Sequence, residues 1–508
     1  MMNTGNLTVG FDVTTQEGIH MNSIHVTTED RCFVLAIDQL AGGTAEDYAD
    51  HICFAVEEIA RAYSDIHSAS FQDCRSAMIA NVANTMSDRV AVNHAAICKV
   101  EERWGKCLNE LHCHLHPLDT IASSCRAALK KVEVEKGALY GTDCVAGNLV
   151  LQISKFRYKD SKGDPKGFCL FLDKNNLPRG LIPRYRGNRF HIIFHTSGIL
   201  ITHHEKFLHF FTTGVVSCGG LQTCIRRDFA STTGQLGLQT LGLFGKLLTG
   251  PWMTKFYRSA EQQIDHIDGI EVVRGVIEAM KQARHDPLRL LTQESDFFSD
   301  LLDDADPVMK AVRIQPPDQQ ASDTLSSMLT ACIDATITVL ERQYGRYFAM
   351  DLTEKLRQET QSARSHNMDA EEIIGMFSAG KNRAPSVTLD FLASKICGQK
   401  NMTVEYLDGL PVEDMDSIVT QSISKARKKR VLLRKRQTAL QSEMSKRVTI
   451  KLQEKKEKSS RALEKQLANI SLDEVPAKFP DLSPERLQVL NDIVRTDRWT
   501  GYCPHLVR

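Results

Sequence analysis

Three acidic residues in this chain stand at the edges of apolar segments. Asp38 closes the run Cys32-Phe-Val-Leu-Ala-Ile-Asp38, Asp88 ends the stretch that starts at Ser76, and Glu371 opens the patterned helix that ends at Phe377. A carboxylate at the end of a buried strand is unfavourable unless its charge is compensated. A divalent cation supplies that compensation when several acids converge on it. The trio therefore predicts one metal site for Mg²⁺ or Mn²⁺, although each acid alone is more often a helix cap or a solvated strand end.

The chemistry that such a site suits is phosphoryl transfer. Cleaving a phosphodiester requires negative charge to be neutralised and an attacking oxygen to be held in line. Two Mg²⁺ ions about 3.5–4 Å apart meet both needs, and carboxylates are the ligands they prefer. We therefore assign Asp38, Asp88 and Glu371 as catalytic and metal-binding residues, with Glu372 as the nearest alternative to Glu371.

A Cys-x-x-His pair, Cys113 and His116, is the second chemically suggestive pattern. Such a pair supplies two of the four ligands that structural zinc requires. The chain offers no second convincing pair, so we do not expect a structural zinc. Packing with one hydrogen bond is the ordinary fate of these residues, but at a helix start they would share a face with a metal or phosphate site.

Several residues are candidates for contact with nucleic acid. Trp252 follows a Gly-Pro break, where an aromatic ring could stack on an unpaired base for about 1–3 kcal/mol, although core packing is the more common role. Basic side chains occur in two clusters that could bind phosphates, with surface ion pairs or a solvated helix face as the alternatives. The clusters are Arg184, Arg186 and Arg189, and Arg427, Lys428, Lys429 and Arg430.

The composition is that of a soluble globular protein with a concentrated basic region. The chain has 508 residues, 42% hydrophobic and 25% charged, and its formal net charge is zero. Residues 425–465 contain sixteen Lys or Arg and four Glu, so the rest of the chain carries the matching acidic excess. No apolar run reaches about 18 residues, so we expect no membrane span. The 14 scattered cysteines and a start without a signal peptide predict reduced thiols inside the cell.

The elements that must position the acids follow an α/β pattern. We expect a poorly patterned segment over residues 1–30, a strand over Gly18–Val26, the strand that ends at Asp38, and helices over Val90–Trp104 and Leu118–Lys131. The predicted division is a first core part (18–200), a helical insertion (201–365), a closing core part (366–408) and a basic helical extension (409–508).

At these residues the chain resembles the hAT superfamily of DNA transposases, over roughly residues 18–400. The strand ending in Asp38 and the tripeptide Ser87-Asp88-Arg89 resemble the first and second acids of the family, and Glu371 in Asn367–Gly375 resembles the third. Cys113 and His116 match the Cys-x-x-His motif. The segment Arg184–Phe190 is similar to the Arg-Trp-Asn segment but lacks its tryptophan. Glu372 stands where the family has arginine, and the start has no zinc-finger DNA-binding module.

The resemblance implies an RNase H-like mixed sheet flanked by helices and interrupted by an all-α insertion. It also implies metal-dependent DNA cleavage and strand transfer through hairpins, a nuclear location and DNA as partner, and we expect a homo-oligomer. The departures are compatible with a decayed or host-adopted copy. The main alternative is a non-enzymatic nucleic-acid or chromatin binder that uses the basic helix. A third is an interaction protein in which Ile418–Ala468 pairs as a helix with a partner, as in a coiled coil, although its apolar positions are irregularly spaced for one.

Overall fold

A five-stranded mixed sheet forms the N-terminal part of the molecule. The computed structural model describes residues 4–16, 18–137, 141–159, 163–184, 191–213, 219–258, 264–468, 483 and 485. The strands are β1 (Leu7–Gln16), β2 (Ile19–Thr27), β3 (Cys32–Leu40), β4 (Val82–Ser87) and β5 (Asn109–His112). Their order in the sheet is β3-β2-β1-β4-β5. Strand β2 is antiparallel to both of its neighbours, β1 and β3, whereas β1, β4 and β5 are parallel to one another.

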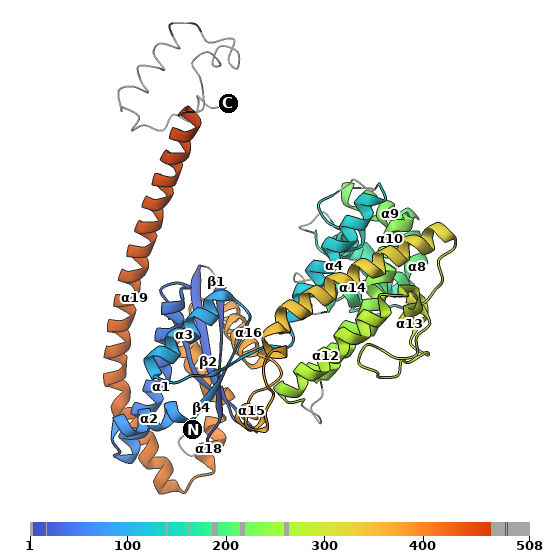
Figure 1. Ribbon diagram of the computed structural model, residues 1–508. Coiled ribbons are helices and arrows are strands. Elements are labelled where there is room, and N and C mark those ends of the chain that lie inside the picture. Colours follow the sequence, from blue (N-terminus) through green and yellow to red (C-terminus); the bar gives the residue numbers. More distant parts are fainter. Residues whose placement is uncertain are drawn as a thin grey trace. The chain divides into compact units, whose positions relative to one another are not determined.

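The alternation of side chains in β1 gives the sheet two different faces. Leu7, Val9 and Phe11 are buried against one layer of helices. That layer is α1 (Ala45–His67) and α3 (Ala91–Trp104). The alternate positions of β1, which include Gly10 and Asp12, lie on the opposite face of the sheet because successive residues of a strand alternate between its two faces. Helices α16 (Met368–Arg383) and α17 (Leu389–Lys400) cover that face, as Figure 1 shows for α16.

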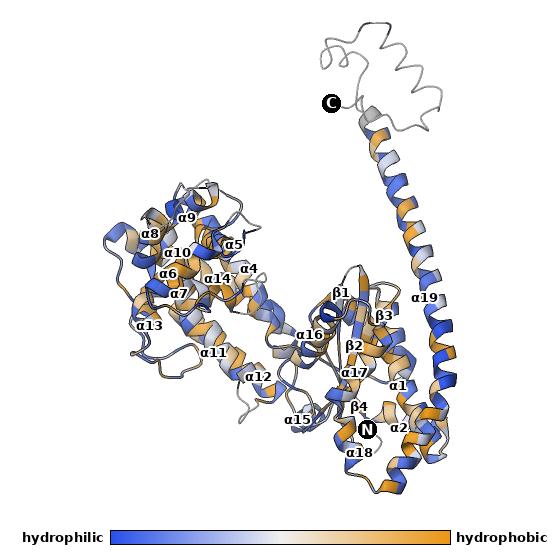
Figure 2. Ribbon diagram, turned by 180° about the vertical axis from the view of Figure 1, so that it is seen from behind, coloured by the Kyte–Doolittle hydropathy of each residue, from blue (hydrophilic) through white to orange (hydrophobic). Residues whose placement is uncertain are grey.

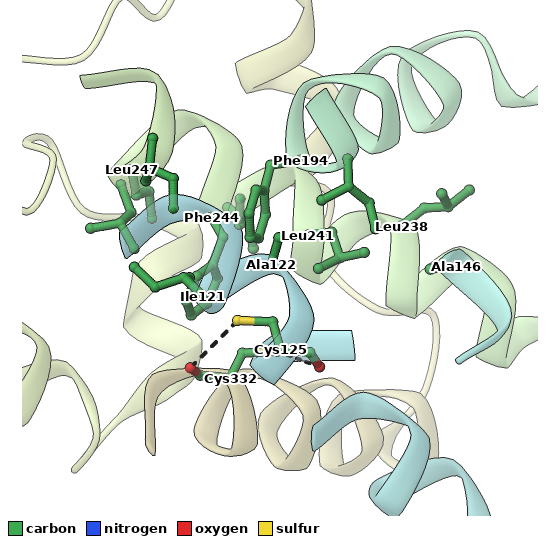
Figure 3. Packing of buried hydrophobic residues seen from close by; sticks show 14 of the residues in the cluster. Ile121, Ala122, Cys125, Ala146, Phe194, Leu238, Leu241, Phe244, Leu247 and Cys332 are labelled. Carbon is green, nitrogen blue, oxygen red and sulfur yellow. Dashed lines mark hydrogen bonds between the residues drawn. The ribbon is translucent and has the colours of Figure 1, made fainter. Parts of the chain in front are cut away.

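A large helical region separates β5 from α16. Its helices are α4 (His116–Glu135), α5 (Val145–Phe156), α6 (Pro165–Lys174), α7 (Ile192–Thr202), α8 (His204–Thr213), α9 (Gly220–Ala230), α10 (Thr232–Phe244), α11 (Gly250–Met253), α12 (His266–Ala283), α13 (Pro307–Val312), α14 (Gln319–Phe348) and α15 (Glu354–Thr360). They share one hydrophobic core that begins at Cys113. In that core Cys125 of α4 and Cys332 of α14 each direct a thiol toward the other's backbone carbonyl (Figure 3).

The C-terminal part is dominated by one long helix. The short helix α18 (Thr403–Asp408) is followed by α19, which runs from Val412 to Ala468. The remaining helix, α2 (Phe71–Asn81), lies in the N-terminal part between α1 and β4. Most of its described side chains are exposed, and apolar residues are scattered among hydrophilic ones along it (Figure 2). The chain separates into two compact units, residues 1–420 and 421–508, so α19 passes from one unit into the other. Among the described helices, none is long and apolar enough to cross a membrane.

Several predicted elements are confirmed and others are displaced. The strands expected over Gly18–Val26 and up to Asp38 are β2 and β3. The stretch from Ser76 to Asp88 is the end of α2 followed by β4. The first thirty residues, expected to be poorly patterned, contain β1, the central strand of the sheet. The shared helical core starts at Cys113, well before the boundary expected at residue 201. No disulfide joins any of the described cysteines.

Helices α7 and α10 cross where two glycines meet. A Cβ built on Gly242 would lie 3.1 Å from the Gly198 Cα and 2.7 Å from a methyl carbon of Val312. Backbone in α7 cannot move aside without disturbing the buried side chains around it, since protein interiors are close-packed. Small residues are therefore required at this crossing.

We predict that Gly242→Ala destabilises the protein by about 1–3 kcal/mol, because the added methyl group overpacks a helix crossing. Gly275→Ala in α12 is the matched control, since no atom lies within 4 Å of its built Cβ. That control should raise stability by up to about 1 kcal/mol through helix propensity. Urea unfolding of both variants measures the two effects. Equal stability of the two variants would contradict the packing argument.

Candidate active site

Two aspartates lie side by side at one end of the central strands. In the parallel ladder between β1 and β4, Gly10 pairs with Met86. Two residues further along each strand are Asp12 and Asp88, and Asp88 directly follows the end of β4. Neighbouring strands are about 4.8 Å apart, and residues two apart on a strand share a face. The register therefore places Asp12 and Asp88 level with each other on the face that α16 covers.

The start of α16 is fixed beside this end of the sheet by two hydrogen bonds. The Asn367 Nδ2 donates to the backbone oxygen of Phe11, the residue before Asp12, at 3.2 Å. The backbone nitrogen of His114 donates to the oxygen of Ser365 at 2.9 Å. Glu371 lies in the first turn of α16, four residues after Asn367. The third carboxylate is thus brought to the two aspartates by backbone anchors on β1 and on the segment after β5.

The other two carboxylates affect the ionisation of Asp12. Burial, followed by the negative charges of Asp88 and Glu371, raises the pKa of Asp12 to about 7 from an ordinary value of 3.8. The Val13 N–H, which donates to Asp12 Oδ1 at 2.8 Å, and the charge of His116 act in the opposite direction. Asp12 is therefore a carboxyl group whose pKa lies near neutral pH, first because it is buried and second because two acids stand near it.

His116 is the positive partner within this acidic cluster. Its Nε2 lies 3.0 Å from Asp88 Oδ2. Burial lowers the pKa of His116, but hydrogen bonds to Asp88 and to the Cys113 sulfur outweigh burial and raise it far above its ordinary value. The Cys-x-x-His pair consequently lies at the acidic site, on the face where the sequence predicted a metal or phosphate site. Its role there is electrostatic, and Cys113 itself is buried.

Arg89 ties the turn that carries Asp88 to the helical region. Its guanidinium lies 4.5 Å from the centre of the Tyr344 ring in α14. It also donates a hydrogen bond to the backbone oxygen of Gln343. A cation held over an aromatic face and bonded to a carbonyl has little freedom to move. Asp88 is thus held from both sides, by β4 before it and by Arg89 after it.

The structure does not bring Asp38 to this cluster. Asp38 pairs with Asn22 on β2, and Asn22 pairs with Val13, the neighbour of Asp12. Directly paired residues share a face, so Asp38 points to the face opposite Asp12 and lies two strands away. There its Oδ2 is 2.9 Å from the Nε2 of His51 in α1. The expected convergence of Asp38, Asp88 and Glu371 is corrected accordingly, and Asp12 takes the position assigned to Asp38.

The sequence around Asp12 contains a pattern that could identify its strand. Leu7, Val9, Phe11 and Val13 alternate with other residues around it, which is the pattern of a half-buried strand. The neighbouring Thr, Asn and Gly residues obscure that alternation.

Glu372, the alternative third acid, forms an ion pair with Lys400 at 2.7 Å.

The expected nucleic-acid residues have different surroundings. Trp252 is fully buried, and its Nε1 donates to the backbone oxygen of His114 at 2.8 Å, so its ring is not exposed for a base. The Arg184 guanidinium lies 6.0 Å from the centre of the Tyr158 ring. Arg186 and Arg189 lie outside the described residues. Arg427, Lys428, Lys429 and Arg430 lie on α19, in the exposed part of that helix.

The donor set of the cluster fits a hard divalent cation. Asp12, Asp88 and Glu371 offer carboxylate oxygens, which Mg²⁺ and Mn²⁺ prefer. Burial and the charges of Asp88 and Glu371 all raise the pKa of Asp12, and a bound cation would act in the opposite direction. A comparison with known protein families finds no model that matches this chain, and no curated protein matches its sequence.

We predict that Asp12→Asn stabilises the metal-free protein increasingly as pH rises. Below about pH 4 Asp12 is protonated in both folded and unfolded chains, so the substitution has little effect. Between about pH 4 and 7 only the unfolded chain releases its proton, and stability of the natural protein falls. Above about pH 7 the variant should be more stable by on the order of 1–3 kcal/mol.

Thermal unfolding in a chelating buffer from pH 4 to 8 measures this difference. Asp408→Asn, at the exposed end of α18, is the control and should leave the profile unchanged. Added Mg²⁺ or Mn²⁺ should stabilise the natural protein at pH 8 and not the Asp12→Asn variant. A pH-independent effect of Asp12→Asn would contradict the electrostatic description of the cluster.

Proposed function

We propose that this chain is a transposase-like protein that cleaves and transfers DNA strands with a divalent metal held by Asp12, Asp88 and Glu371. The observation that carries the proposal is the meeting of three carboxylates from β1, the end of β4 and the start of α16. The proposal keeps two of the acids assigned from the sequence and replaces the first. A copy in which catalysis has decayed is part of the same proposal.

The architecture supports an RNase H-like core of the hAT type. The sheet order is β3-β2-β1-β4-β5, with β2 antiparallel to the other four strands, which run parallel to one another. The helical region lies in the chain between the second and third acids, where the resemblance leads us to expect an insertion. With Asp12 as first acid, the acids come from the central strand, its parallel neighbour and a helix after the insertion.

The residues of the site divide the work of phosphoryl transfer. Bound divalent ions would supply activation of the attacking oxygen and stabilisation of the leaving group. Asp12, Asp88 and Glu371 would hold these ions, and Asp12 gives up its proton as it does so. His116 orients Asp88 and keeps a positive charge beside it. Asn367 and Arg89 hold the backbone that carries the acids.

A DNA-binding protein without catalysis is the second candidate, and the exposed basic helix α19 favours it. Residues 425–465 carry sixteen basic residues and four acidic ones. Basic residues on a solvated helix bind polyanions by releasing counterions, which requires no defined pocket. The same clusters support a nuclear location. That the protein forms homo-oligomers stays a prediction without a structural argument.

We predict that Asp12→Asn lowers Mg²⁺- or Mn²⁺-dependent cleavage of DNA by at least about 100-fold, because it removes a metal ligand. Asp38→Asn is the matched control. The same substitution there keeps a hydrogen-bond acceptor for His51 on the other face of the sheet, so cleavage should change by less than about 3-fold.

Nicking of duplex and hairpin DNA by the full chain, with thermal unfolding as a check on folding, separates the two outcomes. Loss of cleavage in Asp38→Asn with activity kept in Asp12→Asn would restore the assignment made from the sequence. Absence of metal-dependent cleavage in the natural protein would leave only the DNA-binding candidate.

We predict that replacing Arg427, Lys428, Lys429 and Arg430 with Gln weakens DNA binding and flattens its dependence on salt. Loss of four phosphate contacts should lower the slope of log affinity against log salt by up to about 4. Neutralising Lys131, Lys166, Lys174 and Lys206, four exposed lysines of the helical region, is the control. Fluorescence anisotropy at several salt concentrations gives both slopes. An equal loss in the two variants would show that binding is not concentrated on α19.

A further inference from the structure

A second group of potential metal ligands lies on the same face of the sheet, apart from the acidic cluster. His25 is on β2, Cys32 begins β3, and Asp369 is in the first turn of α16. One ligand atom from each residue lies within 4.8 Å of those from the other two. His25 and Cys32 lie at the two ends of one short stretch of chain, whereas Asp369 is more than 330 residues away from both. Their approach is therefore a product of the tertiary fold.

The imidazole of His25 occupies this place without the contacts that usually satisfy a buried ring. The residue is 2% exposed, and its Nδ1 has no hydrogen-bond partner among the described residues. A buried polar nitrogen left unpaired is unfavourable. The ring also lies directly against Gly10 of β1, where a Cβ would be 2.3 Å from the ring atoms Cε1 and Nε2. The glycine leaves room for the ring beside Cys32 and Asp369.

The donor atoms indicate which ion would fit. A nitrogen, a sulfur and a carboxylate oxygen are the ligands of zinc, whereas Mg²⁺ and Mn²⁺ prefer oxygen alone. A thiolate and a carboxylate would balance the two positive charges of the ion. The Arg364 Nη1 lies 3.2 Å from Asp369 Oδ2 and 3.3 Å from its Oδ1. A cation in that position can orient a ligating carboxylate by hydrogen bonding to it from outside.

We propose that His25, Cys32 and Asp369 form a zinc site that joins the β2–β3 hairpin to the start of α16. Three protein ligands leave one tetrahedral position for water. The ion would tie together the turn at Thr28–Arg31 and the helix that carries Glu371, two residues after Asp369. The site is distinct from the Asp12–Asp88–Glu371 cluster in its donor atoms. It would exist whether or not that cluster cleaves DNA.

Cobalt substitution of the full-length protein tests the site directly. Co²⁺ bound by a thiolate gives an intense ultraviolet charge-transfer absorption, which carboxylate ligands do not give. We expect the natural protein to show this absorption with one equivalent of Co²⁺ and to lose it when Zn²⁺ is added. Cys32→Ser should abolish the absorption and lower zinc affinity by at least about 100-fold, because it removes one of three ligands.

Two controls keep the result specific. Cys107→Ser replaces an exposed cysteine outside the group and should keep the absorption. Glu371→Gln should also keep it, since that variant alters only the acidic cluster. Zinc should raise the melting temperature of the natural protein and of both controls, but not that of Cys32→Ser. Absence of the absorption in the natural protein, or its persistence in Cys32→Ser, overturns the proposal and leaves Asp369 as the ion-pair partner of Arg364 alone.

Discussion

Mutual repulsion among carboxylates is the constraint on which the candidate site depends. Asp12, Asp88 and Glu371 cannot all be ionised in a partly buried place without compensating positive charge. In the absence of an ion the protein meets this constraint in two ways. Asp12 keeps a proton near neutral pH, and His116 stays charged beside Asp88. Neither solution removes the repulsion, so a cation that binds there gains from relieving it.

The surrounding structure holds the acids close in spite of this repulsion. Parallel pairing of β1 and β4 fixes the level of Asp12 against that of Asp88. Asn367 anchors α16 on the residue before Asp12. Arg89, the residue that follows Asp88, binds to Gln343 and Tyr344 of α14 in the helical region. Each anchor uses backbone or a cation over an aromatic ring. The acids are therefore positioned by groups that do not depend on the state of ionisation of the cluster.

The sequence predicted local features of this arrangement more successfully than the pairing between them. Two of the strands and several helices follow from apolar patterns along the chain, and the same patterns make Asp88 and Glu371 candidates for the site. The identity of the first acid does not. Asp38 and Asp12 both lie in strands next to apolar residues, and only sheet order and register decide which one faces α16. Register depends on pairing between distant segments, which a pattern within one strand cannot fix. The same limit hid the approach of His25, Cys32 and Asp369.

The contrast between Asp38 and Asp12 shows why a strand-end acid alone is a weak sign of function. Asp38 has a histidine of α1 within hydrogen-bond distance, and that ring in turn meets Asn22. Such a chain of partners satisfies the carboxylate within the protein, so no ligand is needed to explain it. Asp12 receives one backbone N–H and faces two further acids. An acid whose neighbours oppose its charge is a stronger indication of a binding site than one whose neighbours neutralise it, because folding alone does not favour the first arrangement.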